Sequence, residues 1–235
     1  MSSPPSNTLF VTGTDTSIGK TYVCARLLEF LKTKGIQVGY QKWVASGTDA
    51  GLPEDVNLCL DAAGISPTPE LVEQLAPYYF RFPASPHLAA EMENRVVDPE
   101  VIIENYQKLA ARYKWLIVEG VGGVMVPLRR DLLLADLLAR LQPRTLVVAR
   151  SGLGTLNHTL LTLEALRKRN IPVLGIVFSD PEIQEDERLV QDNMQTIEEI
   201  GLVRVFGRLQ RHDDSDKSQA AFMPVGQAIW DQLFR

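Results

Sequence analysis

The chain has 235 residues, of which 45% are apolar and 23% are charged, and its formal net charge is −5. These values are typical of a soluble globular protein, and we expect one domain spanning residues 1–235. The negative charge and the lack of a basic run argue against nucleic-acid binding, so local cations have to meet any anionic ligand. No apolar run approaches the length of a membrane span and no targeting signal opens the chain, which predicts a cytoplasmic protein without a membrane partner.

Strand-like apolar runs alternate with helical patterns along the chain. In chain order, we expect strands near residues 8–13, 36–44, 115–119, 144–149, 171–178 and 202–206. The helices are expected near residues 20–34, 54–63, 99–113, 131–141, 155–169, 185–199 and 223–234. Continuously apolar strands such as 115–118 and 145–149 are typical of a parallel sheet covered on both faces. The alternation predicts a doubly wound α/β fold with a mainly parallel sheet and ligands at the carboxyl ends of its strands.

Three segments fall outside this alternation. Residues 1–7 are expected to form an N-terminal tail. Residues 64–87 contain five prolines and are expected to form an ordered loop region over the site or at an interface. Residues 210–218 are polar throughout, which predicts a mobile loop. The cysteines Cys24 and Cys59 lie outside any C-x-x-C pattern and suggest neither a zinc site nor a disulfide, and we expect Cys24 in the core.

Residues 8–21, TLFVTGTDTSIGKT, read as a strand that runs into a phosphate-binding loop and then into a helix. Such a segment aims backbone N–H groups and a helix N-terminus at one point, which suits a polyphosphate. We expect Lys20 to lie between the β- and γ-phosphates of a nucleotide and the Thr21 hydroxyl to ligate Mg²⁺. The nucleotide-binding residues that this loop predicts are Gly13, Thr14, Asp15, Thr16, Ser17, Ile18, Gly19, Lys20 and Thr21.

The loop departs from the pattern G-x-x-x-x-G-K-[ST] at its first position. Thr14 stands where that pattern has a glycine, and Gly13 comes one residue early. The alternative is an ordinary glycine turn before a helix. Under that alternative, the occurrence of Lys20 and Thr21 directly after Gly19 would be a coincidence.

Further candidate residues lie just past the ends of other expected strands, and parallel strands bring such loops to one edge of a sheet. Glu119 is a candidate Mg²⁺ ligand, and the glycines after it, Gly122 among them, let the backbone approach a nucleotide. Lys42 is a candidate clamp for a transferring phosphoryl group. Asp55 is a weaker candidate metal ligand, and Ser46 is a weaker candidate ligand contact.

Each of these residues also has a purely structural interpretation. Glu119 and Lys42 can be solvated side chains at the ends of strands. Asp55 can be the acidic residue that the first turn of a helix favours, and Ser46 can cap a turn.

A second anion site is possible where the helix expected at residues 155–169 begins. Free N–H groups at Gly154, Thr155, Leu156 and Asn157 suit a carboxylate. Alternatively, Thr155 or Asn157 simply caps the helix. His87 and His158 have no partner carboxylate or nucleophile at a telling spacing, so neither is assigned a catalytic role.

Together, these motifs resemble the dethiobiotin synthetase family over about residues 8–180, and the early glycine is a feature of that family. The resemblance rests on Gly13–Thr16, Gly19–Thr21, Lys42, Val44–Gly47, Ser85–His87, Glu119–Gly123 and Gly154–His158. It implies an ATP- and Mg²⁺-dependent ligase of biotin biosynthesis that closes a ureido ring from 7,8-diaminononanoate and CO₂. One amine of the substrate forms a carbamate, whose oxygen attacks the γ-phosphate of ATP. The second amine then displaces phosphate from the carbamic–phosphoric anhydride.

The resemblance also implies roles for individual residues. Thr16, Lys20 and Thr21 would bind phosphate and metal, with Lys20, Lys42 and Thr16 as the catalytic residues. Asp55 and Glu119 would complete the Mg²⁺ site beside Thr21, and Lys42 and Ser46 would contact the carbamate and the transferring phosphate. The family is a homodimer in which the segment at residues 154–157 of the partner subunit holds the substrate carboxylate.

The chain departs from the family pattern at four places. Trp43 follows Lys42 where the family usually has proline, and Ser17 replaces an acidic residue that is common there. Ser179 and Asp180 stand where an Asn-Asp pair usually reads adenine, and the segment Gly207–Gln210 replaces a Pro-x-Leu loop beyond the last strand. We expect triphosphate chemistry to be retained and base discrimination to be weakened, so that other nucleoside triphosphates serve beside ATP.

Three other functions compete with this interpretation. A partition-type ATPase that binds a protein partner usually has a second lysine where this chain has Thr14. A ureido- or amide-forming ligase that acts on a different amine stays open because of Trp43 and Ser17. A paralogue that binds ligand without turnover is disfavoured by intact Lys20, Lys42 and Glu119.

Overall fold

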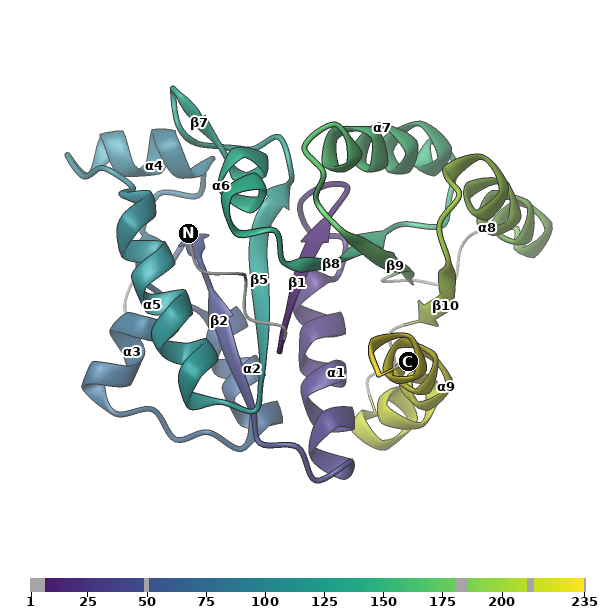
Figure 1. The fold of residues 1–235 in the computed structure, drawn as a ribbon, viewed down its shortest axis with the longest axis horizontal. Helices are drawn as coiled ribbons and strands as arrows, with labels where there is room; N and C mark the ends of the chain where they lie inside the picture. Colours follow the sequence, from purple (N-terminus) through teal and green to yellow (C-terminus); the bar gives the residue numbers. More distant parts are fainter. Residues whose placement is uncertain (1–6, 49–50, 181–185, 211–213, 235) are drawn as a thin grey trace.

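Six strands form the central sheet, and every neighbouring pair in it is parallel (Figure 1). The structure is a computed structural model, and it describes residues 7–48, 51–180, 186–210 and 214–234. The strand order is β10-β9-β8-β1-β5-β2. These strands are β1 (Thr8–Gly13), β2 (Val38–Lys42), β5 (Trp115–Gly123), β8 (Arg144–Ala149), β9 (Val173–Asp180) and β10 (Val205–Gln210).

Helices cover both faces of the sheet (Figure 1). One face carries α1 (Lys20–Thr33), α2 (Glu54–Ala63) and α9 (Ser215–Leu233). The other face carries α3 (Pro69–Leu75), α5 (Pro99–Arg112), α7 (Thr155–Arg167) and α8 (Glu187–Gly201). The double cover explains why β1 and most of β5 and β8 are buried along their length. The predicted doubly wound α/β fold is confirmed.

Smaller elements lie at the carboxyl edge and beside the sheet. β3 (Val44–Ser46) pairs with β4 (Tyr78–Phe80), and β6 (Pro127–Arg129) forms a hairpin with β7 (Leu132–Leu133). The two remaining helices, α4 (Pro86–Met92) and α6 (Leu134–Leu141), adjoin this hairpin. None of the helices in the described parts of the chain has the length and apolar character needed to cross a bilayer.

The proline-rich segment 64–87 is more regular than predicted. It contains α3, β4 and the start of α4, and the prediction of a loop region there is wrong. Pro69 and Pro86 open helices, where a missing N–H costs nothing because the first turn has no acceptor for it. The prolines therefore mark helix starts in this segment.

The end of the chain also differs from the prediction. The segment Gly207–Gln210, expected as a loop, belongs to β10. α9 begins at Ser215 because Asp214 caps it, with its carboxylate accepting hydrogen bonds from the N–H groups of residues 216 and 217. The predicted loop over residues 210–218 is wrong at 210 and at 215–218, which lie in β10 and α9, and residues 211–213 lie outside the described residues. The predicted N-terminal tail, residues 1–7, lies outside them too, except Asn7.

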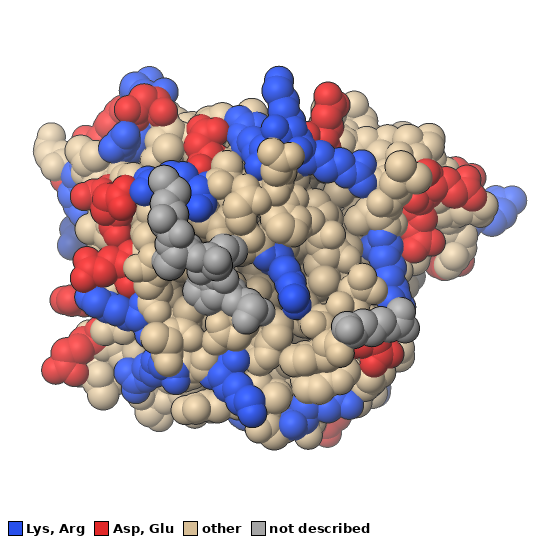
Figure 2. Space-filling model, viewed as in Figure 1, with Lys and Arg blue, Asp and Glu red and all other residues tan. Residues whose placement is uncertain are grey.

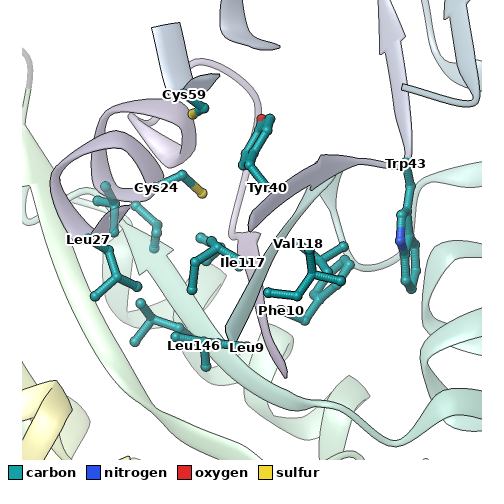
Figure 3. Packing of buried hydrophobic residues seen from close by; sticks show 14 of the residues in the cluster. Leu9, Phe10, Cys24, Leu27, Tyr40, Trp43, Cys59, Ile117, Val118 and Leu146 are labelled. Carbon is teal, nitrogen blue, oxygen red and sulfur yellow. The ribbon is translucent and has the colours of Figure 1, made fainter. Parts of the chain in front are cut away.

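The side chains of Tyr40 in β2 and of Trp43, the residue that follows β2, point to opposite faces of the sheet (Figure 3). Tyr40 lies on the α1 side of the sheet with Cys24 and Cys59, and Trp43 lies on the opposite side (Figure 3). Trp43 is fully buried, and its ring packs 4.7 Å from the ring of Phe10. Trp43 therefore fills the core behind the strand end, and the strand still delivers Lys42 to the site face. Cys24 is buried as predicted.

Charges of both signs are interspersed on the molecular surface shown in Figure 2. The formal net charge is only −5. An anionic ligand is therefore held by cations at its own site, and the molecule as a whole supplies little attraction.

Candidate functional site

The segment between β1 and α1 has the backbone of a phosphate-binding loop. Gly19 precedes α1 with a φ of 94°, and no described side chain caps this helix, so its first N–H groups are open to an anion. A Cβ at position 13 would lie 2.5 Å from Ile18 Cδ1. It would also lie 3.0 Å from the Asp15 carbonyl oxygen, so a glycine at this early position relieves crowding against the backbone of the loop. Lys20 Nζ donates to the Asp15 carbonyl oxygen at 2.8 Å.

Strands β2 and β5 bring Lys42 and Glu119 side by side. The two residues are partners in the parallel register, and Lys42 Nζ donates to Glu119 Oε1 at 3.0 Å. The Thr21 hydroxyl, from the first turn of α1, donates to the same oxygen at 2.9 Å. The side chains of Lys42 and Glu119 are only 7% and 1% exposed. Their interpretation as solvated strand-end side chains is therefore wrong.

Asp55 joins this cluster from the first turn of α2. Its carboxylate accepts a hydrogen bond from Lys42 Nζ, and its side chain is 48% exposed. Asp55 is therefore both a first-turn acidic residue and a member of the charged cluster.

The two lysines have pKa values that shift in opposite directions. Burial lowers the pKa of Lys20, and the nearby Glu119 carboxylate only partly offsets this. Burial also disfavours the charged form of Lys42, but the Glu119 and Asp55 carboxylates outweigh it and raise the Lys42 pKa. Lys42 is therefore firmly protonated, whereas the charge of Lys20 is incompletely compensated and available to an anion.

These side chains line one cavity of about 1020 Å³ at the carboxyl edge of the sheet. It is large enough for a nucleotide or a substrate of similar size. Its lining includes Thr16, Ser17, Gly19, Lys20, Thr21, Lys42, Ser46, Asp55, Glu119 and Gly122. The structure thus brings together the predicted phosphate, metal and carbamate contacts from four separate parts of the chain. The other predicted loop residues, Gly13, Thr14, Asp15 and Ile18, are not among the lining residues.

The oxygen ligands in this cavity suit a magnesium ion. Thr21, Asp55 and Glu119 supply a hydroxyl and two carboxylates, and a single ammonium group reaches both carboxylates. Mg²⁺ is usually bound by one or two carboxylates together with substrate phosphates. The described residues hold no cluster of three or more His, Cys, Asp or Glu suited to a metal.

The predicted substrate-carboxylate segment does not line this cavity. Gly154 caps α7 with a φ of 93°, and no described side chain caps that helix. The Thr155 hydroxyl is buried and pairs with the Thr159 hydroxyl, and Gly154 is the N-cap. The alternative in which Thr155 or Asn157 caps the helix is therefore wrong. The Thr155 N–H donates to the Gly152 carbonyl oxygen at 3.1 Å, so the predicted anion site lacks this donor, and residues 154–157 are not among the lining residues of the phosphate cavity.

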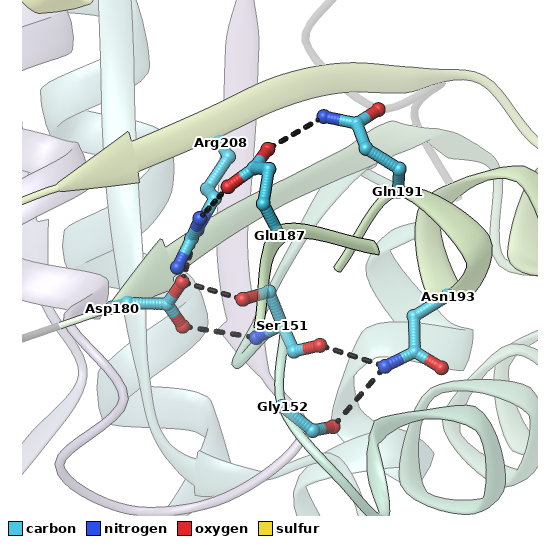
Figure 4. A network of polar contacts seen from close by, with 7 residues as sticks. All are labelled: Ser151, Gly152, Asp180, Glu187, Gln191, Asn193 and Arg208. Atoms are coloured by element: carbon cyan, nitrogen blue, oxygen red, sulfur yellow. Dashed lines mark hydrogen bonds and ion pairs between the residues drawn. The ribbon is translucent and has the colours of Figure 1, made fainter. Parts of the chain in front are cut away.

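Ser179 and Asp180, the predicted base contacts, end β9 and are buried. The Asp180 carboxylate accepts hydrogen bonds from the Ser151 N–H and hydroxyl at 2.9 and 2.5 Å, and it pairs with Arg208 (Figure 4). Asn193 donates to the Ser151 carbonyl oxygen and holds the same loop (Figure 4). Asp180 is therefore committed to internal contacts that join β8, β9 and β10.

One contact in the site was not predicted from the sequence. Tyr40 donates to Glu119 Oε2 at 2.7 Å, and its side chain is fully buried. Burial raises the Tyr40 pKa, with Cys59 and Glu119 adding to the shift, so the phenol stays protonated. The available signal was spacing, because Tyr40 lies two residues before Lys42 and thus on the same strand face.

Comparison with known proteins identifies the family. A family model described as an AAA domain matches residues 7–219. The ATP-dependent dethiobiotin synthetase BioD of Methanococcus vannielii is 42% identical over 199 residues, which cover 85% of this chain and 91% of the relative. The chain belongs to the dethiobiotin synthetase family. The enzyme of the same name from Methanocaldococcus jannaschii is 38% identical over 210 residues, covering 88% of this chain and 95% of the relative. The family resemblance inferred from the motifs is confirmed.

Solved structures with a similar fold are far more distant in sequence. The pNOB8 ParA protein, solved bound to nonspecific DNA, has a TM-score of 0.60 and 10% identity, with 97% of this chain and 98% of that chain covered. The MinD cell division protein of Aquifex aeolicus has a TM-score of 0.53 and 13% identity, with 97% and 95% covered. At this identity the likeness establishes the phosphate-loop fold and nothing of the function.

Proposed function

We propose that this protein is an ATP-dependent dethiobiotin synthetase, which closes the ureido ring of dethiobiotin from 7,8-diaminononanoate, CO₂ and ATP. The observation that carries the proposal is the meeting of Lys20, Lys42, Thr21 and Glu119 in one cavity beneath an open helix start. Phosphoryl transfer depends mainly on positioning and charge neutralisation, and these residues supply both. Two relatives that this chain matches over most of their length are named ATP-dependent dethiobiotin synthetase.

In this proposal, the loop N–H groups and Lys20 bind the β- and γ-phosphates, with Thr16 at the loop's exposed rim. Thr21, Asp55 and Glu119 would hold Mg²⁺, which neutralises phosphate charge when bound. Lys42 now donates to both carboxylates. With these carboxylates holding metal, its ammonium group would be available to the carbamate oxygen and to the phosphoryl group that this oxygen attacks. Ser46, on the same rim, is placed to hydrogen-bond the carbamate.

The substrate carboxylate requires a second site, and we propose that the partner subunit of a homodimer supplies it. No side chain caps the start of α7, and its N–H groups other than that of Thr155, which is bonded to the Gly152 carbonyl oxygen, suit a carboxylate; residues 154–157 do not line the phosphate cavity of their own subunit. Exposed apolar side chains lie beside them: Leu153 is 90% exposed and Leu161 on α7 is 56% exposed. A dimer contact over α7 would cover these side chains and carry the helix start to the neighbouring cavity.

We propose further that the base of the nucleotide is read weakly. Ser179 offers one hydroxyl, buried and without a hydrogen-bond partner among the described residues, where the family usually offers an amide. The carboxylate of Asp180 is already occupied by Ser151 and Arg208. Loss of paired hydrogen bonds to a base removes about 1–3 kcal/mol of discrimination. Measurement of kcat/KM with ATP, CTP and GTP at fixed diamine tests this, and a preference for ATP above about 100-fold would contradict it.

The activity itself is tested with pure protein, MgATP, bicarbonate and 7,8-diaminononanoate. The proposal predicts a ureido product detected by mass spectrometry and ADP release that needs both the diamine and bicarbonate. ATP hydrolysis that ignores the diamine would favour a nucleotide switch that binds a protein partner. Carbamate-dependent ADP release with another amine but not with this diamine would favour a ligase of different specificity.

A further inference from the structure

The two oxygens of the Glu119 carboxylate have different neighbours. Oε1 accepts hydrogen bonds from Thr21 and Lys42, both of which line the cavity. Oε2 accepts a hydrogen bond from the hydroxyl of Tyr40, whose side chain is fully buried. One oxygen is therefore turned toward the ligand space, and the other is tied to the core.

The Tyr40 contact has a fixed direction, because an ionised carboxylate can only accept and the phenol must donate. Glu119 is 1% exposed, so water has little access to an oxygen that loses its partner. A buried carboxylate oxygen without a donor is costly, and rotation about the last side-chain bond would be its simplest relief. Such a rotation would also move Oε1 away from the cavity.

We propose that Tyr40 is a positioning residue for the metal site, holding Glu119 so that Oε1 faces the metal and Oε2 stays in the core. This inference rests on the proposed role of Glu119 as a magnesium ligand. If Oε1 held a metal, it would give up its contacts with Thr21 and Lys42, and the Tyr40 hydrogen bond to Oε2 would be the one left to fix the carboxylate. Groups that hydrogen-bond a metal ligand typically change metal affinity about 10- to 100-fold.

The alternative is that Tyr40 is only a satisfied core tyrosine, and the chain contains a matched example. Tyr106 is also fully buried, and its hydroxyl lies 2.8 Å from the Thr8 hydroxyl. Tyr106 packs against Trp43, which lies on the face of the sheet opposite Tyr40 (Figure 3). Tyr106→Phe therefore removes a buried phenol hydrogen bond of similar length without touching the site.

The experiment compares Tyr40→Phe, Tyr106→Phe and the unchanged protein by calorimetric ATP binding, once with Mg²⁺ and once with EDTA. The proposal predicts that Tyr40→Phe weakens binding about 10- to 100-fold with Mg²⁺ and changes it little in EDTA. Tyr106→Phe should leave both affinities unchanged. In turnover, Tyr40→Phe should raise the Mg²⁺ concentration for half-maximal rate by a similar factor while kcat at saturating Mg²⁺ is nearly retained.

Two outcomes would overturn the proposal: unchanged Mg²⁺-dependent binding in Tyr40→Phe, or equal losses with Mg²⁺ and in EDTA. These outcomes are distinct from failure of the proposed function, because ATP binding needs neither diamine nor bicarbonate. If Tyr40→Phe does not fold, a crystal structure of the unchanged protein with MgADP decides the question. Metal on Oε1 with the Tyr40 contact to Oε2 intact would support the proposal, and metal on Oε2 or a broken contact would overturn it.

Discussion

Lys20 and Lys42 both place an ammonium group in the same cavity, but their surroundings shift the two pKa values in opposite directions. Lys42 is compensated by two carboxylates, which raise its pKa. Lys20 donates to a backbone carbonyl, and burial lowers its pKa. The uncompensated lysine is the one that the phosphate loop presents to an anion. The buried charge of Lys20 therefore lowers the free energy of unfolding of the ligand-free protein, and the same charge is available to bind an anionic ligand.

Lys20→Met tests this cost. Because the folded-state pKa of Lys20 is lowered, the folded protein binds this proton less tightly than the unfolded chain, and the charged lysine destabilises the fold at neutral pH. Lys20→Met should therefore raise the melting temperature at pH 7. The gain should shrink as the pH rises through the folded pKa toward the unfolded value. Turnover should fall about 100-fold or more. Thermal unfolding between pH 7 and 10 measures the first effect, and a lower melting temperature at pH 7 would contradict the account.

Lys42→Met separates the metal site from catalysis. Lys42 occupies the carboxylates that would bind metal, so removing its charge should tighten binding of free Mg²⁺ to the nucleotide-free protein. The same change should lower kcat about 100-fold or more, because the cation beside the transferring group is lost. Calorimetry with Mg²⁺ alone checks the first effect, and weaker Mg²⁺ binding in the variant would be the contrary result.

At the scale of elements, the site depends on strand register and on one tight loop. Val11 on β1 and Lys42 on β2 are both register partners of Glu119 on β5. The sequence motif located the loop and the strand ends, and parallel-sheet geometry predicted their convergence. Tyr40 was missed because its partner lies 79 positions away, and a tyrosine in an apolar strand resembles ordinary core packing.

Gly13→Ala tests the loop. The new Cβ would lie 2.5 Å from the terminal methyl of Ile18, which can move, and 3.0 Å from the Asp15 carbonyl oxygen, so the loop backbone has to shift slightly. We expect a loss of about 1–3 kcal/mol in the free energy of unfolding and a larger loss of nucleotide affinity. Gly123→Ala is the control, because its Cβ would meet its nearest neighbour at 3.4 Å, an ordinary contact. Nucleotide binding by Gly13→Ala as tight as by the control would show that the tight loop is unnecessary.

The proline-rich segment and the chain end illustrate what local patterns fail to predict. Short elements depend on partners from other parts of the chain. The helix α4 packs against β6, which comes later in the chain, and β4 pairs with β3, which comes earlier. The polar stretch at residues 215–218 is helical because Asp214 caps it and the apolar residues beyond pack against α1. Composition alone therefore assigned loops where capping and tertiary contacts make helices.

At the scale of the whole molecule, a complete site is proposed to need two subunits. Leu161→Glu on α7 would place a charge in the proposed dimer contact, whereas Leu202→Glu changes an equally apolar residue that is 82% exposed after α8. We expect Leu161→Glu to give a monomer by analytical ultracentrifugation and to raise the KM for the diamine, with MgATP affinity unchanged. Leu202→Glu should change none of these. A Leu161→Glu protein that remains dimeric, or a monomer with an unchanged diamine KM, would refute the shared site.

The most direct test of the central claim follows the oxygen atoms of bicarbonate. If Lys20 and Lys42 hold a triphosphate against a carbamate, the carbamate oxygen attacks the γ-phosphorus and leaves with phosphate when the second amine closes the ring. Turnover with ¹⁸O-labelled bicarbonate, quenched before exchange with water, should therefore release phosphate that carries one label, while the ureido carbonyl keeps the other. Unlabelled phosphate, with its new oxygen drawn from water, would contradict the account.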